Sequence, residues 1–428
     1  PFVAVNLKSN ITQITHSQNF RHGILYTIFS FINSGIGFIL LLILAQYLTP
    51  ADYGSLNLFT TFVTLLNIVI ALCTTSYITV SFFQKPKETL CQIILIAFST
   101  ATGMLVLIAI VMLFFPAFVE QSVGIPVEYL WLGVMICYFG IFNSVNLDIW
   151  RLEEKPVTYG IYGVSFAVCN FILSFWLIVG LKYGWQGRVY AWFLLGVLYF
   201  IISIVFLIKR RYLVLSRTSW NLIKETFIYA LPLLPHTASF WLKQGLDRYI
   251  INYFHGQADV GYFSFAMNLA AIITMIGTAF NATNSVYIYK KLAEGYHRVR
   301  NILSKQTKIM TLVFFIISIT VGLFALGLIH FFIPRYDGSI QYIMPLCIGS
   351  FAHCIYFLWG NYLFYYKKTK QLMHITLSTA LLQVILSIWL TPYSPLYTAY
   401  ISMSITILTM TLVWLKSKKV LKNNTGRV

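Results

Sequence analysis

Three charged side chains lie close together in a stretch of chain that is otherwise mostly apolar. Lys243, Asp247 and Arg248 belong to a hydrophobic run over residues 226–252, which is long enough to cross a membrane. A charge at the centre of a bilayer costs roughly 2.5–3.5 kcal/mol, so such a side chain normally faces a partner or a water-filled cavity. Lys243 and Asp247 are four residues apart and would pair on one helical face, whereas Arg248 points elsewhere. We expect a cavity wall here; structural pairing, with the long side chains reaching water at the outer interface, is the alternative.

Other polar residues stand at less informative positions. Arg21 opens the first hydrophobic run and is a candidate for the cavity, although a positive anchor at the membrane surface fits its position better. His236 and His353 lie within hydrophobic runs, where they could relay protons or hydrogen-bond a neighbouring helix. Asp148 and Arg151, three residues apart at the end of the fourth run, could pair as an interfacial anchor.

Motifs of catalysis are missing from the sequence. It contains no nucleophile elbow, no phosphate-binding glycine-rich loop and no zinc-ligand spacing among its histidines and six cysteines. The longest expected outer connection, roughly residues 116–128, is too short to fold as a catalytic domain. We therefore expect no enzymatic activity, no metal and no cofactor.

The elements that position these residues follow from composition. Hydrophobic residues make up 58% of the 428 residues and charged residues only 10%, against about 25% charged in a typical soluble domain. The apolar residues form continuous runs of about 20, which predict transmembrane helices rather than barrel strands. The prediction is an all-α polytopic membrane protein with about twelve helices, at residues 24–47, 56–80, 91–115, 129–149, 158–181, 189–208, 226–252, 260–285, 309–332, 341–364, 372–391 and 396–415.

The distribution of lysine and arginine predicts the orientation. With the amino terminus in the cytoplasm, 25 of the 30 Lys and Arg residues fall in cytoplasmic segments, and only three, Lys182, Arg188 and Arg335, fall on the opposite side. Such a bias is the usual signature of membrane topology. Both termini are therefore expected in the cytoplasm, and the formal net charge of +18 gives no reason to expect a nucleic-acid partner.

A short motif is repeated in the two halves of the chain. The segment from Ala51 to Gly54, which contains Asp52, recurs 207 residues later with Asp259 and Gly261 in the same places. Both copies lie between the first and second runs of a six-run half. Since six is an even number, the halves should have the same orientation, as in transporters with parallel repeats.

The repeat defines the expected domains. Residues 1–208 form a first lobe, residues 209–225 a basic cytoplasmic linker, residues 226–415 a second lobe and residues 416–428 a basic cytoplasmic tail.

The two halves differ in charge. Ile36 and Leu40 stand where the second half has its lysine and aspartate, so we expect a permeation site built mainly from the second half. Pro232 and Pro235 in the seventh run release carbonyl groups and permit bending there, as a rocking transporter would use; an irregularity of helix packing is the alternative.

Both repeat motifs resemble segments of a known family. The first motif and its flank resemble the opening of the Wzx-type polysaccharide flippases, which belong to the multidrug/oligosaccharidyl-lipid/polysaccharide (MOP) exporter superfamily. The second motif and its flank resemble that family's repeat. The matching residues run Leu44-Ala45-Gln46-Tyr47-Leu48-Thr49-Pro50-Ala51-Asp52-Tyr53-Gly54, and Asp247-Arg248-Tyr249 followed by Ala258-Asp259-Val260-Gly261.

The resemblance implies a V-shaped, two-lobed transporter in the bacterial inner membrane. Its substrate would be an undecaprenyl-diphosphate-linked oligosaccharide, an O-antigen or capsule repeat unit, which it would flip between leaflets by alternating access. Family members line the cavity with cations, which here match Lys243, Arg248 and Arg21. The implied partners are this lipid-linked substrate, membrane lipids and a coupling proton or sodium ion.

Two alternatives remain open at this stage. A cation-coupled multidrug exporter of the same superfamily would favour deep carboxylates, for which Asp247 is the candidate. A membrane-embedded glycosyltransferase or acyltransferase would need larger outer loops than this chain has.

Overall fold

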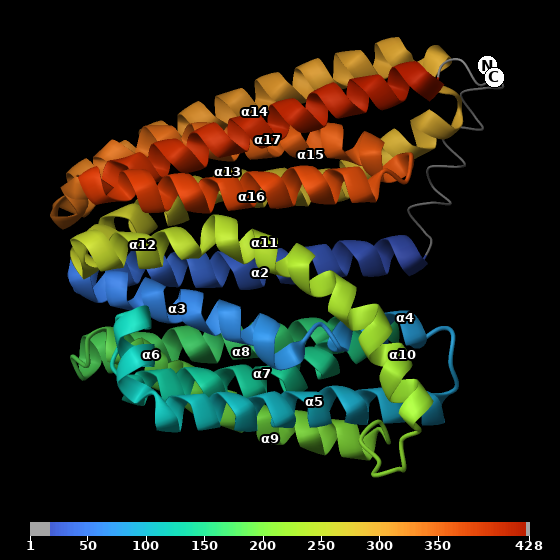
Figure 1. Ribbon diagram of the computed structural model, residues 1–428, viewed down its shortest axis with the longest axis vertical. Coiled ribbons are helices and arrows are strands. Elements are labelled where there is room, and N and C mark those ends of the chain that lie inside the picture. The colour runs from blue at the N-terminus through green and yellow to red at the C-terminus, as the bar shows by residue number, and fades with distance from the viewer. Residues whose placement is uncertain (1–17, 425–428) are drawn as a thin grey trace. The chain divides into compact units, whose positions relative to one another are not determined.

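The computed structural model describes residues 18–424, without the side chains of residues 18–24, 27, 236, 423 and 424. Throughout this part of the chain the secondary structure is helical, without strands, and the helices are labelled in Figure 1. Eleven helical segments of the described residues are long and apolar enough to cross a membrane. The prediction of an all-α, multi-pass membrane protein is confirmed.

The helices group into two compact units, each of which is described by itself. Unit 1 comprises the described residues up to Tyr47 together with residues 62–121 and 125–234, and unit 2 comprises residues 48–61, 122–124 and 235–424 of the described chain. The helix α3 therefore contributes its beginning to unit 2 and the rest to unit 1.

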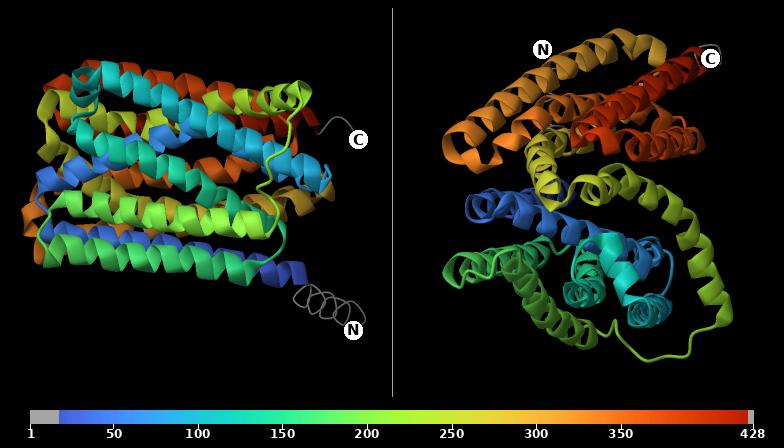
Figure 2. Two further views of the ribbon diagram at one scale, coloured as in Figure 1. Left: turned by 90° about the horizontal axis from the view of Figure 1, so that it is seen from below. Right: turned by 60° about the vertical axis from the view of Figure 1, so that its left-hand side comes forward.

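Unit 1 is built on five helices that form a chain of contacts: α2 packs on α8, α8 on α9, α9 on α7 and α7 on α5. The helices α7, α8 and α9 run alongside one another in Figures 1 and 2. A short π-helical turn, Trp176–Gly180, extends α8. The bounds are α2 Gln18–Tyr47, α3 Pro50–Ala71, α4 Thr75–Ser81, α5 Lys87–Phe114, α6 Pro116–Val123, α7 Val127–Leu152, α8 Pro156–Phe175, α9 Trp185–Lys209 and α10 Trp220–Ala230.

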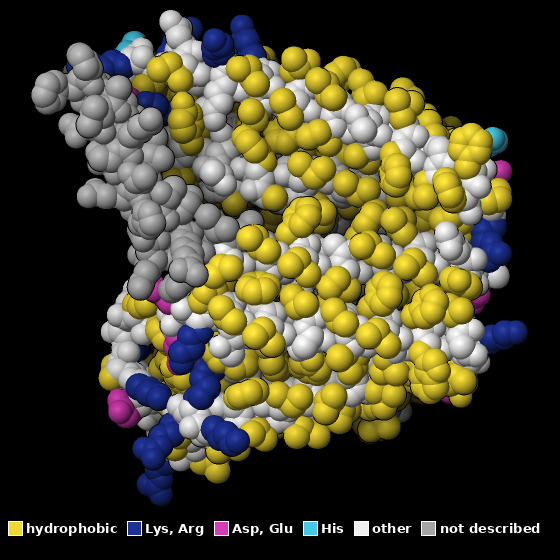
Figure 3. Space-filling model, turned by 180° about the vertical axis from the view of Figure 1, so that it is seen from behind, with side chains coloured by type: hydrophobic (Ala, Val, Ile, Leu, Met, Phe, Trp, Pro, Cys, Tyr) yellow, Lys and Arg dark blue, Asp and Glu magenta, His cyan; other side chains and the backbone are white. Residues whose placement is uncertain are grey.

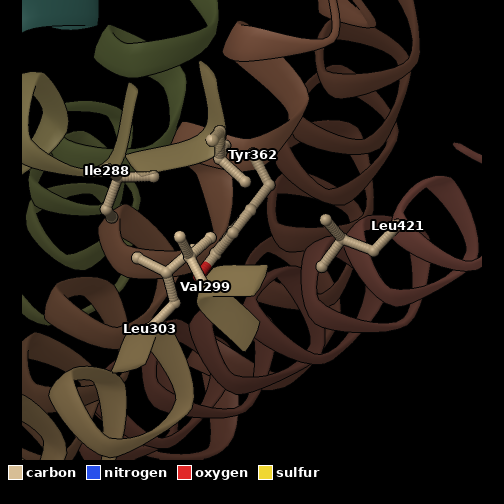
Figure 4. Packing of buried hydrophobic residues seen from close by; sticks show 6 residues of the cluster. Ile288, Val299, Leu303, Tyr362 and Leu421 are labelled. Atoms are coloured by element: carbon tan, nitrogen blue, oxygen red, sulfur yellow. The ribbon is translucent and has the colours of Figure 1, made fainter. Parts of the chain in front are cut away.

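Unit 2 is centred on α15, which packs against α13, α14 and α17, while α16 packs against α17. One part of its core, shown in Figure 4, joins α13, α14, α15 and α17 through Ile288, Leu303, Tyr362 and Leu421. The bounds are α11 Leu234–Gln244, α12 Leu246–His255, α13 Gln257–Ala293, α14 Tyr296–Phe332, α15 Ile340–Tyr365, α16 Thr369–Leu390 and α17 Pro395–Asn424, with short 3-10 turns at Pro334–Ser339 and Thr391–Tyr393. A further 3-10 turn, Leu231–Leu233, belongs to the end of unit 1.

The outer surfaces of the helices match a lipid environment. Large side chains such as Phe114, Leu323 and Ile385 are more than 60% exposed. On the face shown in Figure 3, hydrophobic side chains cover the sides of the helices, and Lys and Arg gather toward their ends. Because apolar surface of this extent is stable only in contact with lipid or another protein, it supports the membrane assignment.

The seventh expected span departs from a single helix. Residues 226–252 fall into the end of α10, a 3-10 turn, α11 and α12. Pro232 lies in the 3-10 turn and Pro235 in the first turn of α11, where the missing N–H is tolerated. Gly245 separates α11 from α12, and a Cβ there would lie 2.9 Å from Thr61 Cγ2 and from the Trp241 ring nitrogen. The α-helix is therefore interrupted at the two prolines, and Gly245 adds a second break.

A charged cluster holds the loop ends of unit 1 together. The Glu153 carboxylate lies 2.6 Å from Arg210 Nη2 and 2.9 Å from Lys155 Nζ, and it accepts a hydrogen bond of 2.7 Å from the Tyr212 hydroxyl. Burial tends to raise the pKa of Glu153, but these hydrogen bonds and the charge of Arg210 together lower it below its usual 4.5. The ionised carboxylate therefore stabilises the fold.

A more exposed ion pair joins α10 to the loop before α5. Lys85 Nζ lies 2.7 Å from both carboxylate oxygens of Glu225, and the Tyr77 hydroxyl donates to one of them at 2.6 Å. The hydrogen bonds from Lys85 and Tyr77 lower the pKa of Glu225. Because the Glu225 side chain is 51% exposed, solvent screens this pair far more than the Glu153 cluster.

Candidate functional site

Lys243 lies at the end of α11 and points among hydroxyl groups rather than carboxylates. Its Nζ donates to Thr379 Oγ1 on α16 at 2.8 Å and to Thr409 Oγ1 on α17 at 3.2 Å. Thr409 Oγ1 in turn donates to Thr379 Oγ1 at 3.0 Å. Neither of these contacts is a carboxylate, so they do not compensate a positive charge on the Lys243 side chain.

Asp247, in the first turn of α12, is 1% exposed and has its own partners. Its two oxygens accept hydrogen bonds from Gln383 Nε2 at 2.8 Å and from Ser387 Oγ at 3.0 Å. Gln383 Nε2 also lies 2.9 Å from the Lys243 carbonyl oxygen. Gln383 and Ser387 are four residues apart on α16, so both face Asp247.

The expected ion pair between Lys243 and Asp247 was wrong. Within the described part of the chain, neither residue forms a salt bridge with the other. The i, i+4 geometry requires a continuous helix, and the break at Gly245 falls between the two residues. Each side chain instead finds neutral partners on the helices packed against it.

Arg248 follows Asp247 on α12 and turns toward α13. Its Nε donates to Ser264 Oγ at 3.0 Å, its Nη1 donates to the carbonyl oxygen of Gln244, and its Nη2 lies 3.5 Å from the sulfur of Met267. All three of these partners are neutral, so Arg248 also carries a positive charge with no carboxylate among these contacts.

A cavity of about 160 Å³ opens beside Lys243 in unit 2. It is lined by α11, α13, α15, α16 and α17, and its lining includes Lys243, His353, Tyr356, Gln383 and Thr409. Among the described residues that line it, there is no aspartate or glutamate; Asp247 lies behind Gln383 and does not line it. A cavity with this lining would bind an anionic or hydroxyl-rich group in preference to a cation.

The remaining predicted residues are placed as follows. The side chains of Arg21 and His236 lie outside the part of the chain that the structure describes. Arg151 Nη2 lies 2.8 Å from Asp148 Oδ1 as an i, i+3 pair at the end of α7, away from both cavities described in this section. His353 lies on the cavity wall and packs edge-on against Phe357.

The two copies of the repeat motif contact each other within unit 2. A Cβ on Gly54 would lie 1.9 Å from the carbonyl oxygen of Gln257, and a Cβ on Gly261 would lie 1.9 Å from the carbonyl oxygen of Pro50. Gln257 and Pro50 are the first residues of α13 and α3, so the two helix starts cross with a reciprocal close approach. The glycines are therefore packing residues, which only a missing side chain allows.

The acidic residues of the motif lie in the first turns of the same helices. The Thr49 hydroxyl donates to Asp52 Oδ2 at 2.7 Å, and the Asp52 backbone N–H lies 3.1 Å from Thr49 Oγ1. Thr49 is therefore the N-cap of α3, because its hydroxyl oxygen accepts from the backbone N–H of the third helical residue. Asp259 occupies the first turn of α13, where a negative charge is favourable to the helix dipole.

The sequence analysis did not predict a role for the polar residues on α16. Thr379, Gln383 and Ser387 recur every four residues and supply the partners of Lys243 and Asp247. That spacing was a usable signal, since four-residue periodicity of polar residues in an apolar run marks a helix face turned away from lipid.

Arg188 was likewise assigned only to an outer connection. In the structure it belongs to the first turns of α9 and lines a cavity of about 400 Å³ in unit 1.

Comparisons with known proteins agree with this architecture. The family model of the polysaccharide biosynthesis protein matches residues 20–286, and the MatE model matches residues 232–389. The chain is 23% identical over 378 residues to "Lsg locus putative protein 1" of Haemophilus influenzae, covering 85% of this chain and 89% of that protein.

Two solved structures share the fold. A multidrug resistance MATE family transporter of the MOP superfamily superposes with a TM-score of 0.77 at 16% identity, covering 93% of this chain and 96% of that one. The lipid II flippase MurJ superposes with a TM-score of 0.72 at 17% identity, covering 92% and 87%.

Fold and site together define a multi-pass helical membrane protein that shares the fold of a MOP superfamily transporter, with charged and hydroxyl side chains facing cavities among its helices. The chain belongs to the polysaccharide biosynthesis protein family, whose model matches more than half of its length.

Proposed function

We propose that this protein translocates an undecaprenyl-diphosphate-linked oligosaccharide, an O-antigen or capsule repeat unit, across the bacterial inner membrane by alternating access. The observation that carries the proposal is the cavity of unit 2, where the lysine ammonium is held only by hydroxyl groups. A diphosphate cannot enter a membrane protein unless its charge meets positive charge or water. Lys243, with Arg248 on the next helix, would supply that charge.

Transport against a gradient needs a coupled ion, and we propose Asp247 as the residue that binds this ion. Its carboxylate is buried and receives hydrogen bonds from neutral groups. A buried carboxylate with neutral partners can take up a proton or a cation with little rearrangement, because either event removes an uncompensated charge. The proposal places both chain termini in the cytoplasm, in accordance with the lysine and arginine bias.

A multidrug exporter is the second candidate, favoured by the MatE match over residues 232–389. Such a protein carries organic cations, which would need a carboxylate on the cavity wall. Among the described lining residues of unit 2 there is none, so the anionic substrate is the better fit.

Deletion of the gene tests the main proposal. Surface polysaccharide should be lost while lipid-linked repeat units accumulate in the inner membrane, and a plasmid copy should restore the surface polymer. Normal surface polysaccharide in the deletion strain would contradict the proposal. Efflux of cationic dyes that disappears on deletion would favour the multidrug exporter.

Thiol labelling tests the cavity separately. In a variant without native cysteines, Lys243→Cys should react with a water-soluble thiol reagent, because its cavity is expected to be hydrated. Ser387→Cys is the matched control, since Ser387 is 0% exposed behind Asp247 on α16. Equal protection of both positions would show that the cavity is closed to water.

A further inference from the structure

A second charged cavity lies in unit 1, and the proposed function does not use it. It has a volume of about 400 Å³, within the range of roughly 300–1,000 Å³ for ligand pockets. The helices α2, α7, α8 and α9 line it, and Arg188 is the one charged residue among the described residues on its wall.

Arg188 has only part of its binding capacity in use. Its Nη1 donates to Ser174 Oγ on α8 at 2.8 Å, and its guanidinium lies 5.7 Å from the ring centre of Trp192. In the described part of the chain, no carboxylate lies within salt-bridge distance of it. A planar guanidinium that still has N–H donors to offer is the typical partner of a carboxylate bound through two hydrogen bonds.

Two amide oxygens on the same wall are also without partners. Asn33 Oδ1 on α2 and Asn143 Oδ1 on α7 are closed off from solvent and accept no hydrogen bond from the described residues. Buried acceptors of this kind usually have a donor. Because both oxygens are closed off from the cavity as well as from bulk solvent, the hydroxyl groups of a ligand would reach them only after the two amide side chains turn toward the cavity. Together with the flat face of Trp192, they form the lining expected for a sugar ring.

The internal repeat supplies an independent argument. The fifth and eleventh spans, Pro156–Gly180 and Thr369–Tyr393, have 25 residues each, so Asn170 and Ser174 of unit 1 correspond to Gln383 and Ser387 of unit 2. In unit 2 this polar pair holds the carboxylate of Asp247.

In unit 1 the corresponding pair lies beside the guanidinium instead. Ser174 Oγ accepts from Arg188 and lies 3.3 Å from Asn170 Oδ1. The repeat position of the aspartate is Leu40, which lines the same cavity. Unit 1 therefore has the cation and the polar pair but lacks a carboxylate of its own.

From these features we infer that the unit 1 cavity binds a carboxylated sugar, with its carboxylate on Arg188, its hydroxyl groups on Asn33 and Asn143, and its ring against Trp192. A single guanidinium balances one negative charge, whereas a diphosphate would leave charge uncompensated in a low-dielectric site. The inference rests on the proposed function, and it specifies an acidic sugar in the lipid-linked oligosaccharide. Such a carboxylate would otherwise have to cross the hydrocarbon layer unpaired.

Ligand binding to the purified full-length protein in lipid nanodiscs tests the inference. The probes are free glucuronate, glucose and acetate, and two undecaprenyl-diphosphate oligosaccharides that differ only in carrying glucuronate or glucose at one position. We expect the glucuronate-bearing member of each set to bind tighter. Binding of free glucuronate would identify the sugar alone as the ligand, whereas a preference seen only with the lipid-linked pair would identify the intact substrate.

Variants locate the site. Arg188→Gln should weaken glucuronate binding about ten- to a hundredfold, the range of a charge-assisted hydrogen bond, and should leave the neutral probe unchanged. Arg188→Lys keeps the charge without the fork and should give an intermediate loss. Lys182→Gln, which removes an exposed positive charge before α9, is the matched control and should bind as the wild type does.

Two further variants keep the inference testable if Arg188→Gln does not fold. Leu40→Asp gives unit 1 a carboxylate at the repeat position of Asp247 and should abolish the preference for glucuronate. Asn143→Ala should weaken binding of the sugar while leaving its preference for the carboxylate.

Three outcomes would overturn the inference: equal binding of glucuronate and glucose, equal binding of glucuronate and acetate, or an unchanged preference in all cavity variants. Each is distinct from failure of the proposed function, because the deletion strain reports translocation of lipid-linked units whatever sugar they contain.

Discussion

The crossing of α3 and α13 makes a quantitative prediction about two glycines. In Gly54→Ala the new Cβ would lie 1.9 Å from a backbone carbonyl oxygen, where contacts under 3.0 Å are essentially never found. Since the obstacle is backbone rather than a flexible side chain, the two helix starts must separate by about 1 Å. Overpacking of this kind costs about 1–3 kcal/mol, partly offset by the gain of up to about 1 kcal/mol for alanine in a helix.

The reciprocal geometry adds a second, stricter expectation. Gly261→Ala requires the same separation of α3 and α13, because its Cβ would meet the carbonyl oxygen of Pro50 at 1.9 Å. Once the helices have separated for one methyl group, the other is accommodated at little further cost. The double variant should therefore lose at least about 0.5 kcal/mol less than the sum of the single losses.

Thermal unfolding of the detergent-purified protein measures both effects. For a unit of roughly 200 residues, a loss of 1 kcal/mol lowers Tm by about 2–4 °C. Gly360→Ala on α15 is the matched control, because a Cβ at this helical glycine meets nothing within 4 Å and should leave Tm unchanged or raise it. Gly54→Ala and Gly261→Ala that unfold at the Tm of this control would contradict the prediction. Losses of unfolding free energy that simply add in the double variant would contradict it as well.

Three further predictions concern charged groups. Because Lys243 and Asp247 have separate partners, the losses of transport caused by Lys243→Ala and by Asp247→Asn should add in the double variant. The measurement is the amount of accumulated lipid-linked units. A coupling energy well above about 0.5 kcal/mol would show that the two side chains interact as an ion pair. The pKa of Glu153 is lower in the folded protein than the usual 4.5, so its carboxylate stabilises the fold above pH 4.5. This stabilisation is lost as the pH falls through the pKa that Glu153 has in the folded protein. Glu153→Gln should therefore lower Tm at pH 7 and lose its effect in acid; a difference that persists in acid would contradict this. Glu225→Gln should cost at most about 1 kcal/mol, because the pair with Lys85 is exposed, and 1 M salt should remove most of that cost in a Tm measurement.

Family membership and cavity chemistry point in the same direction. The family model matches residues 20–286, while the cavity of unit 2 comes from residues 239–409, so the two lines of support rest on largely different parts of the chain. Both support the proposal of an anionic, lipid-linked sugar as substrate, and the inference drawn from the cavity of unit 1 concerns the acidic sugar of that proposed substrate.

The helices and the repeat could be read from the sequence, because both are local properties. Runs of about 20 apolar residues must be helical in lipid, where backbone groups find no water to bond. The interruption of the α-helix at Pro232 and Pro235 also followed from covalent structure alone, since proline lacks the backbone N–H. The matching positions of Gly54 and Gly261 were visible as a pattern, although their role was not.

Only the tertiary structure decided which charges meet. Sequence spacing paired Lys243 with Asp247, but the break at Gly245 and the polar face of α16 gave each residue separate partners. Sequence topology placed Arg188 in an outer connection, whereas packing of four helices placed it on a cavity wall. Hydrophobic periodicity constrains which face of a helix avoids lipid, but the partner of a buried charge depends on helices far away in the chain.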